Sequence, residues 1–372
     1  MTRARTRSAV AVIPAVQGDA RYEVRVGPGA AQALAGLVRG HDRVALVTAR
    51  PVLRSPVARA ALDLVRREAR AATVVTLPDG ERGKTLAQLE RSATALLRGG
   101  CTRRSLVVAV GGGAVSDAAG FLASTFMRGV SWAAVPTTLL AMVDAAIGGK
   151  TAVNLPVAKN AVGAFHPPVA VLADPAALAT LPPRELRSGL GEVLKYAALD
   201  PALLGRFAAA RAGLPGADLV AACARAKVDV VRADPTERGE RKLLNLGHTF
   251  GHGVEAAGKF DRWTHGEAVA IGLAFAFRLA ERMGRIGPLA LAEIEDAIRG
   301  AGLPVRVPPA VARRAAALMG YDKKRTDAGL RWVLPLARGS SWTVEWDVAA
   351  PDHAVAAAVQ EISAFDSRRD RR

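Results

Sequence analysis

Length, composition and charge restrict the class of protein. The chain has 372 residues, half of them apolar, which is enough for two folded domains and excludes an intrinsically disordered protein. Its two cysteines, Cys101 and Cys223, are too few for a disulfide framework or a cysteine-built zinc site, so we expect a reducing, cytoplasmic location. No uninterrupted apolar run is long enough to span a bilayer, and the N-terminal stretch does not resemble a signal peptide.

The net charge of +17 attracts polyanions, but its distribution argues against a specific nucleic-acid partner. Arginines are scattered along the chain and crowd at its two ends, without a basic stripe interleaved with aromatic residues. An arginine-rich, solvated surface explains much of this excess. We therefore expect a small anionic ligand, and neither a membrane nor a specific nucleic acid.

The first half of the chain alternates buried strands with helices. The strand-like segments are continuous apolar runs, which are typical of parallel strands covered on both faces. A helix is expected in "TLAQLERSATALLRGG" (85–100). This pattern predicts an α/β domain with a mostly parallel sheet. The expected strands are "RVALVTA" (43–49), "ATVVTLP" (72–78), "SLVVAVGGG" (105–113), "VSWAAVPTT" (130–138) and "VAVLAD" (169–174).

Three glycines end the third of these strands. Gly111, Gly112 and Gly113 leave backbone amides unshielded by side chains, so a pyrophosphate can bind there. The same glycines also fit a tight strand-to-helix turn without a ligand, and this motif alone leaves both interpretations open. The stretch "GGKT" (148–151) is not a P-loop, because Asp144 stands where the first glycine is required.

The periodicity changes near Leu181. Long Ala/Leu-rich segments of helical period begin after Pro182 and Pro183, which suit the first turn of a helix. They predict a mainly α-helical C-terminal domain, with "LRWVLPL" (330–336) and "WTVEW" (342–346) as late strands. We expect domains at residues 1–178 and 179–372, packed directly with a ligand cleft between them.

Three of the six histidines gather in one short span. His248 and His252 are one helical turn apart, and His265 follows closely. Two imidazoles and one carboxylate form the ligand set of a catalytic zinc site, and either Glu192 or Glu267 can supply the carboxylate. The competing interpretation is a set of histidines satisfied within the core. The motif HExxH is absent, which argues against a zinc protease.

Charged residues elsewhere have a surface interpretation and a site interpretation. Glu192 and Lys195 are three apart on one helix face, which by itself favours a surface ion pair, although apolar flanks weaken that view. Several basic and amide residues lie beside Gly, Asn and apolar neighbours, which suggests that they converge on an anion. These are Arg128, Lys150, Lys159, Asn160, Lys227, Arg241, Lys323 and Lys324.

Six sequence blocks in this order resemble the 3-dehydroquinate synthase family, which belongs to the sugar phosphate cyclases. They are "GGGAVSDAAGFLASTFMRG", "VPTTLLAMVDAAIGGKTAVNLPVAKNAVGAFHPP", "LPPRELRSGLGEVLKYA", "LLNLGHTFGHGVEAA", "HGEAVAIG" and "DKK", within roughly residues 20 to 345. The resemblance implies an NAD-binding α/β domain, a helical domain with a divalent metal (zinc or cobalt), and a homodimer.

The resemblance also implies roles for individual residues. The metal ligands match Glu192, His248 and His265, and His252 faces the substrate phosphate. Catalytic positions match Lys150, Lys195, Lys227, Glu237, Arg241, Asn245 and His252. Substrate-binding positions match Arg128, Asp144, Lys159, Asn160 and Lys324. NAD-binding positions match Glu81, Lys84, Gly112, Gly113, Asp117, Thr137, Thr138, Lys150, Lys159 and Thr180.

The implied reaction converts 3-deoxy-D-arabino-heptulosonate 7-phosphate to 3-dehydroquinate and phosphate, a step of the shikimate pathway. NAD is reduced and reoxidised in each turnover. There are three alternatives. The first is a related aminodehydroquinate synthase or another cyclase of secondary metabolism. The others are a metal-dependent alcohol dehydrogenase and a basic binding protein. Three places depart from the family pattern. In the family an acidic residue usually follows the strand at 43–49, but here Ala49 and Arg50 stand there, and the arginine could suit NADP. Ser116 and the pair Pro235–Thr236 also replace the residues usual in the family.

Overall fold

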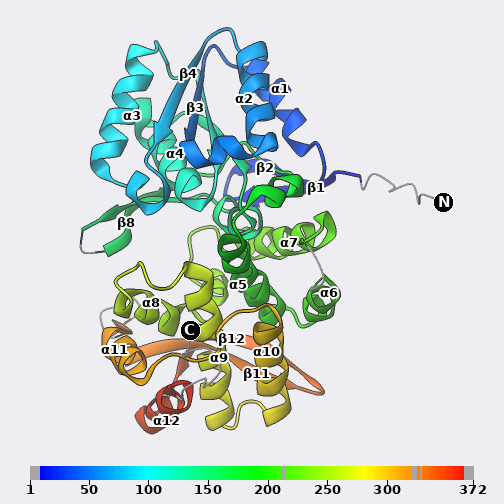
Figure 1. The fold of residues 1–372 in the computed structure, drawn as a ribbon, viewed down its shortest axis with the longest axis vertical. Helices are drawn as coiled ribbons and strands as arrows, with labels where there is room; N and C mark the ends of the chain where they lie inside the picture. Colours follow the sequence, from blue (N-terminus) through cyan, green and yellow to red (C-terminus); the bar gives the residue numbers. More distant parts are fainter. Residues whose placement is uncertain (1–8, 157, 211–213, 320–324, 327–328, 364–372) are drawn as a thin grey trace, which may run out of the picture. The chain divides into compact units, whose positions relative to one another are not determined.

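The computed structural model describes residues 9–156, 158–210, 214–319, 325–326 and 329–363 (Figure 1). The chain divides into two compact units. The first comprises Met1–Pro182 and Leu214–Thr236, and the second comprises Pro183–Gly213 and Glu237–Arg372. This division reflects how densely residues pack within each unit. The predicted functional domains, residues 1–178 and 179–372, stay a prediction.

A seven-stranded sheet forms the centre of the first unit. Its strand order is β1-β2-β9-β6-β5-β3-β4, and every neighbouring pair is parallel except the antiparallel β1–β2 hairpin. The predicted parallel sheet is therefore confirmed. The strands are β1 (Ala11–Gln17), β2 (Ala20–Val26), β3 (Val44–Ala49), β4 (Ala72–Leu77), β5 (Leu106–Gly111), β6 (Ser131–Pro136) and β9 (Ala170–Ala173).

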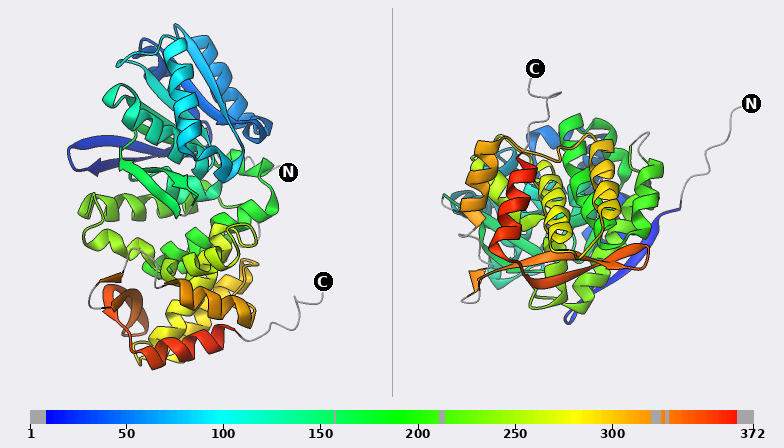
Figure 2. Two further views of the ribbon diagram at one scale, coloured as in Figure 1. Left: turned by 90° about the vertical axis from the view of Figure 1, so that its left-hand side faces the viewer. Right: turned by 90° about the horizontal axis from the view of Figure 1, so that it is seen from below.

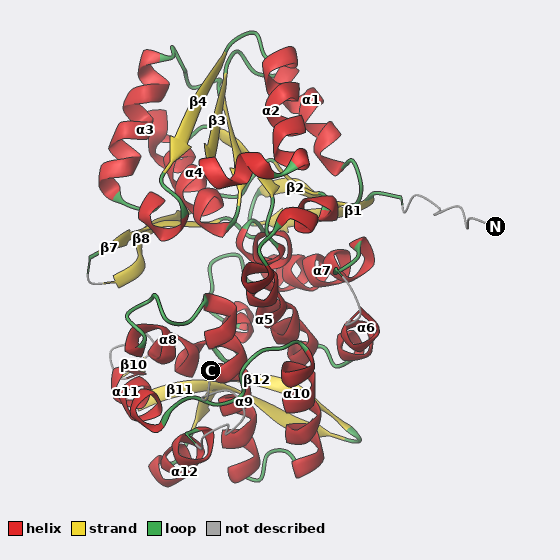
Figure 3. Ribbon diagram, in the orientation of Figure 1, coloured by secondary structure: helices red, strands yellow, loops and turns green. Residues whose placement is uncertain are grey.

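Helices cover both faces of this sheet (Figure 3). Side chains of β3 and β5 alternate between the faces, so that Leu46 and Val108 join the apolar cluster under α1 and α2. Central strands buried on both faces need no polar side, which explains their continuous apolar sequences. The helices are α1 (Leu34–Arg39) and α2 (Pro56–Glu68) on that face, α3 (Leu86–Arg98) and α4 (Gly113–Thr125) on the other, and α7 (Ala217–Ala233) beside β1.

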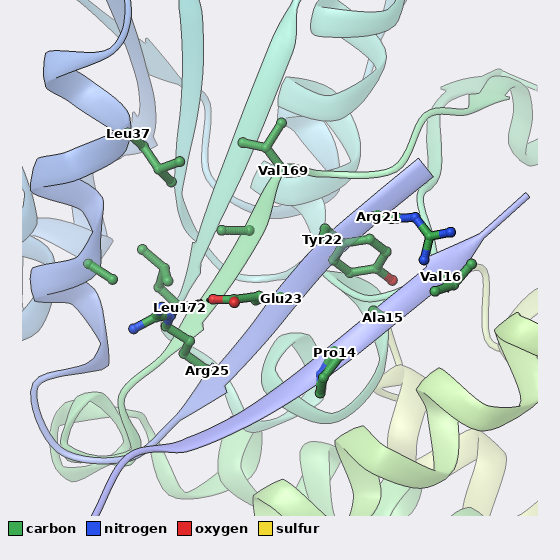
Figure 4. A pocket seen from close by; sticks show the side chains of 12 residues that line it. Pro14, Ala15, Val16, Arg21, Tyr22, Glu23, Arg25, Leu37, Val169 and Leu172 are labelled. Carbon is green, nitrogen blue, oxygen red and sulfur yellow. Dashed lines mark hydrogen bonds and ion pairs between the residues drawn. The ribbon is translucent and has the colours of Figure 1, made fainter. Parts of the chain in front are cut away.

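Two hairpins of the first unit were not predicted from the sequence. One is β1–β2 at the sheet edge, and the other pairs β7 (Lys150–Leu155) with β8 (Ala158–Phe165). Beside the first, Tyr22 and Leu172 line a hollow of about 430 Å³ (Figure 4). None of the predicted site residues lines this hollow.

The second unit is mainly helical, as predicted, and its two predicted late strands are present as β11 and β12, which pair with each other. Helix α9 is buried almost throughout, and β11 packs against it (Figure 2). Phe275 of α9 stacks on Phe250 of α8 with ring centroids 4.2 Å apart and contacts Trp332 of β11 at 5.5 Å. The helices are α5 (Pro183–Leu199), α6 (Ala202–Ala210), α8 (His248–Ala257), α9 (His265–Arg282), α10 (Pro288–Gly300), α11 (Pro309–Met319) and α12 (Asp352–Ile362). The strands are β10 (Arg325–Thr326), β11 (Gly329–Arg338) and β12 (Ser341–Ala349).

None of the helices that the structure describes combines the length and the apolar character that crossing a bilayer requires.

Candidate metal centre and nucleotide site

Glu192, His248 and His265 come together in the second unit. Glu192 lies within α5, and the two histidines are the first residues of α8 and α9. One potential ligand atom from each lies within 4.8 Å of the others. Three helices that are separate in the sequence therefore bring one carboxylate and two imidazoles to the same point.

A glycine adjoins each of these residues and lets the helix backbones approach closely. A Cβ on Gly266 would collide with the carbonyl oxygen of Ser188 in α5, and one on Gly191 would collide with Gly266 itself. Gly247 has φ of +77°, and a Cβ there would lie 2.8 Å from the backbone nitrogen of Leu273 in α9. The ligand spacing is thus set by backbone contacts that only glycine permits.

Both imidazoles are held at Nδ1 and direct Nε2 to the same carboxylate oxygen. His248 Nδ1 lies 3.1 Å from the carbonyl oxygen of Leu246, and His265 Nδ1 lies 3.3 Å from Oε2 of Glu255. Their Nε2 atoms lie 3.5 Å and 3.0 Å from Glu192 Oε1. Carbonyl and carboxylate oxygens only accept hydrogen bonds, so each Nδ1 carries a proton.

The second oxygen of Glu192 faces a buried ammonium group. Lys195 Nζ lies 2.5 Å from Oε2 of Glu192, and both side chains are 1% exposed. Burial raises the pKa of Glu192, but Lys195 and the two imidazoles hold this pKa well below its usual range. The surface interpretation of this ion pair is wrong, because the apolar flanks of α5 bury both partners.

The two histidines have opposite pKa shifts. Burial lowers the pKa of His248 to about 4, so this ring is neutral at pH 7. Burial also disfavours the charged form of His265, but Glu255 and Glu192 outweigh it and raise the pKa of His265 to about 10. Without a cation between them, the carboxylates of Glu192 and Glu255 therefore keep the His265 ring protonated.

The donor set fits a divalent transition metal. A tetrahedral ion about 2.1 Å from each ligand separates the ligand atoms by roughly 3.4 Å, so a small adjustment within the observed 4.8 Å completes the site. Glu267, the alternative carboxylate, instead caps α9 through the backbone nitrogen of Thr264 and pairs with Arg184. These contacts engage its carboxylate, and the ligand atoms that meet are those of Glu192, His248 and His265.

Other predicted residues of the second unit lie in α8 and in the segment that precedes it. The exposed His252 ring is 5.4 Å from the His248 ring, between centroids. Asn245 Nδ2 donates to Oε1 of Glu237 at 2.9 Å. Arg241 is fully buried, in the turn before α8. The predicted Lys324 lies outside the described residues.

The glycine turn of the first unit lies at the carboxyl end of β5. The chain passes from β3 outward to β4 and returns to β5 on the opposite side of β3, which makes the β3–β5 boundary a topological switch point. Thr137 N donates to the carbonyl oxygen of Gly111 at 2.9 Å, and a Cβ on Gly112 would lie 2.9 Å from Cγ2 of Thr138. Three predicted NAD contacts, Gly112, Thr137 and Thr138, are therefore neighbours.

A polar network connects further predicted NAD and substrate residues. Lys84, 3% exposed, donates to Oδ2 of Asp117 at 2.7 Å and to Oδ1 of Asn160 at 2.6 Å. Asn154 accepts from the Asn160 backbone at 2.9 Å and donates to Glu81 at 2.6 Å. Burial disfavours charge on Lys84, but Asp117 and Glu81 outweigh it and raise the Lys84 pKa. Asn154 was not predicted, because nothing in its own neighbourhood distinguishes it from other strand residues.

The remaining predicted residues of the first unit are dispersed over several elements. Lys227 of α7 forms an ion pair with Asp144, which connects α7 to the π-helix Ala141–Ala145. Lys150 begins β7 and Lys159 lies in β8, both half-buried. Arg128 and Thr180 are exposed at the ends of short 3₁₀-helices.

Comparison with solved structures places the fold in a known class. The structure of 2-deoxy-scyllo-inosose synthase complexed with carbaglucose-6-phosphate, NAD+ and Co2+ matches 94% of this chain and 99% of its own, with a TM-score of 0.79 and 24% identity. ValA, a 2-epi-5-epi-valiolone synthase from Streptomyces hygroscopicus subsp. jinggangensis 5008 solved with NAD+ and Zn2+, matches 94% and 98%, with a TM-score of 0.80 and 27% identity. The fold is that of the sugar phosphate cyclases.

Sequence comparison identifies the family within this class. The profile of 3-dehydroquinate synthase, N-terminal, matches residues 74–188, and that of 3-dehydroquinate synthase, C-terminal, matches residues 189–325. The 3-dehydroquinate synthase of Halorhodospira halophila (strain DSM 244 / SL1) is 44% identical over 327 residues, covering 85% of this chain and 90% of its own. The chain belongs to the 3-dehydroquinate synthase family.

Proposed function

We propose that this enzyme converts 3-deoxy-D-arabino-heptulosonate 7-phosphate to 3-dehydroquinate and phosphate, using NAD and a divalent metal ion. The observation that carries the proposal is the cluster of the buried Glu192 and His248 with the partly exposed His265, in a chain of this family. A probable glycerol dehydrogenase from Sinorhizobium meliloti 1021 has a lower TM-score, 0.59, at 19% identity. This favours the cyclase over the alcohol dehydrogenase alternative.

The metal centre has a defined task in this reaction. Glu192, His248 and His265 would hold the ion, which supplies Lewis-acid stabilisation for a substrate hydroxyl that loses its proton. The protein orients both imidazoles through Leu246 and Glu255, so that their Nε2 atoms already face Glu192. The neighbouring Lys195 contributes a buried positive charge that stabilises anionic oxygens close to Glu192.

The glycine turn would bind the dinucleotide. Backbone amides at Gly112 and Gly113 open the N-terminus of α4, where a pyrophosphate is favoured by the helix dipole and by free N–H donors. The dinucleotide held there would be NAD, which would supply hydride-transfer chemistry without net formation of NADH. Asp117 lies in the same helix and pairs with Lys84, and both would contact the cofactor after giving up part of this pairing.

The substrate would be held by charge. It carries a phosphate and a carboxylate, and Lys150, Lys159, Lys227 and Arg241 are cations suited to both groups. Binding the phosphate in a fixed orientation lets it take the proton of the neighbouring C–H during its own elimination. The remaining predicted assignments are Arg128, Asp144, Asn160, Glu237, Asn245 and His252 as substrate contacts and Glu81, Thr137, Thr138 and Thr180 as NAD contacts.

Choice of dinucleotide depends on the end of β3. Ala49 is buried there, and the exposed Arg50 follows it, without an acidic residue to bind the ribose 2′-hydroxyl. We expect NAD to bind more weakly than in an enzyme with that acid, yet to remain the cofactor. Dissociation constants for NAD and NADP, measured by calorimetry, test this; tighter binding of NADP would contradict it.

The decisive experiment follows both products. Purified protein is incubated with NAD, a divalent metal and the heptulosonate phosphate, and phosphate release and dehydroquinate are measured with and without a chelator. We expect both products in equal amounts, loss of activity with the chelator, and no accumulation of NADH. Metal-replete protein that forms neither product would overturn the proposal. The homodimer and the cytoplasmic location stay predictions.

A further inference from the structure

Glu255 is a buried acid that the sequence analysis did not single out. It lies in α8, seven residues after His248, and is 3% exposed. Two helical turns separate the pair, so both side chains lie on the same side of α8. Its Oε2 atom lies 3.3 Å from Nδ1 of His265, the first residue of α9.

The contact determines which nitrogen of His265 is available as a ligand. The carboxylate of Glu255 accepts a hydrogen bond from Nδ1–H of His265, which leaves Nε2 as the lone-pair nitrogen of the neutral ring. That atom is 3.0 Å from Glu192 and belongs to the cluster of ligand atoms. The ring is therefore fixed between two carboxylates, one at each nitrogen.

The two histidines of the cluster are supported differently. A backbone carbonyl, that of Leu246, holds His248, and a backbone atom cannot be changed by substitution. A charged side chain holds His265, and its negative charge makes the imidazole a stronger electron donor than a carbonyl does. His265 is thus the ligand whose strength depends on a replaceable residue.

We propose that Glu255 is a positioning residue for the metal centre: it orients His265 and strengthens its bond to the ion. The proposal rests on the proposed metal site. It adds a second carboxylate, so that Glu192 and Glu255 together balance the charge of a divalent ion. Partners of this kind change metal affinity by about 10- to 100-fold when they are replaced.

The test measures metal affinity in the full-length protein. Glu255→Gln keeps an acceptor of the same shape but removes the charge, and Glu255→Ala removes both. Zinc dissociation constants are obtained by competition with a chromophoric chelator, and Co2+ absorption reports the coordination geometry. We expect zinc to bind about tenfold more weakly to Glu255→Gln and toward a hundredfold more weakly to Glu255→Ala.

Glu295→Gln is the matched control. Glu295 is also a buried acid of the second unit, 7% exposed, and pairs with Arg278 of α9. Arg278 is 13 residues after His265, which corresponds to about 20 Å along the helix. This variant should lower the melting temperature of the metal-free protein while leaving the zinc dissociation constant unchanged.

The outcomes separate this proposal from the proposed function. Wild-type protein that binds neither zinc nor Co2+ would overturn the metal site and the role of Glu255 with it. Wild-type binding that both Glu255 variants retain within twofold, while His265→Ala loses it, would overturn the role of Glu255 alone. Weaker zinc binding in both variants, with the metal-free melting temperature of Glu255→Gln unchanged, supports orientation over a general structural role.

Discussion

The metal centre and the nucleotide turn are assembled by different means. Glu192, His248 and His265 converge as side chains from three helices, and buried charges decide their protonation. The proposed nucleotide turn is formed by backbone at Gly112 and Gly113, which have no side chains to cover its amides. A site built from side chains can be removed by substituting one ligand residue at a time. A site built from backbone is disturbed mainly by substitutions that add a side chain to a glycine.

The two regions also differ in how their charged groups are engaged. In the nucleotide region, Lys84 is held by Asp117 and Asn160. In the metal centre, both imidazoles and Lys195 surround a single carboxylate, Glu192. We expect ligand substitutions to abolish chemistry with little loss of stability, and substitutions in the Lys84 network to reduce stability first.

The largest expected effect is that of His265→Ala. Removing this ligand should release the metal and lower kcat/KM by about a thousandfold, because a bound ion contributes several kcal/mol to transition-state stabilisation. Metal content by mass spectrometry and the rate of phosphate release measure the two losses. His353→Ala, at an exposed position of α12, is the control and should change neither. Activity of His265→Ala within tenfold of wild type would contradict a catalytic role for a metal bound at His265.

Lys84→Met tests the network of the first unit. The variant leaves the partly buried Asp117 without its ammonium partner, which should lower the free energy of unfolding by about 3 kcal/mol. Urea denaturation measures this change, and zinc affinity should stay as in wild type. The double variant Lys84→Met/Asp117→Asn should recover part of the lost stability. An unfolding free energy equal to that of wild type in Lys84→Met would show that the pair does not stabilise this unit.

Gly112→Ala adds one methyl group to the turn. Its Cβ would lie 2.9 Å from Thr138 Cγ2, so that crowding should cost about 1–2 kcal/mol and weaken NAD binding about tenfold. Fluorescence titration with NADH measures the binding. Gly36→Ala in α1 is matched, because a Cβ there has no neighbour within 4 Å; this change should be neutral or stabilising. Equal NAD affinity in both variants would contradict a backbone site at Gly112.

The smallest effect is expected for Asp42→Asn, a polar change in the first unit outside both sites. A hydrogen bond from Thr102 at 2.6 Å is the main cause that lowers the pKa of Asp42. Stability from a lowered pKa is present above the ordinary value of 3.8 and is lost as the pH falls through the folded value.

The variant should therefore be less stable by under about 1 kcal/mol at pH 7, and equally stable in strong acid. Chemical denaturation at several pH values measures this difference. A gap between Asp42→Asn and wild type that grows as the pH falls would have the wrong sign.

The sequence predicted the elements whose patterns are local. Continuous apolar runs identified β3, β4, β5, β6 and β9 as strands, and two prolines marked the start of α5. The prediction that all five are buried is wrong for β4, which lies at the sheet edge and is largely exposed. The β1–β2 hairpin was not predicted because Pro14 argues against a strand in this segment. The structure places β1 at the sheet edge, where a proline is tolerated. The second hairpin, β7–β8, has polar, half-buried strands without a clear alternation.

For the site, residue type was more informative than position. Histidine spacing indicated a metal site, but it did not distinguish His248 from His252 or Glu192 from Glu267. The family resemblance selected the ligands, and the structure brings those three residues, Glu192, His248 and His265, together. Glu255 contacts His265 of α9, and Asn154 contacts Glu81, so each partner lies outside the residue's own helix or strand. The spacing of Glu255 from His248, two helical turns, is the one feature that could have identified it.

The glycines beside the ligands have a consequence for how such enzymes diversify. Gly191, Gly247 and Gly266 fix the distances between three helix backbones before any cofactor binds. Residues that contact a substrate can then be exchanged over generations while the coordination geometry is inherited intact.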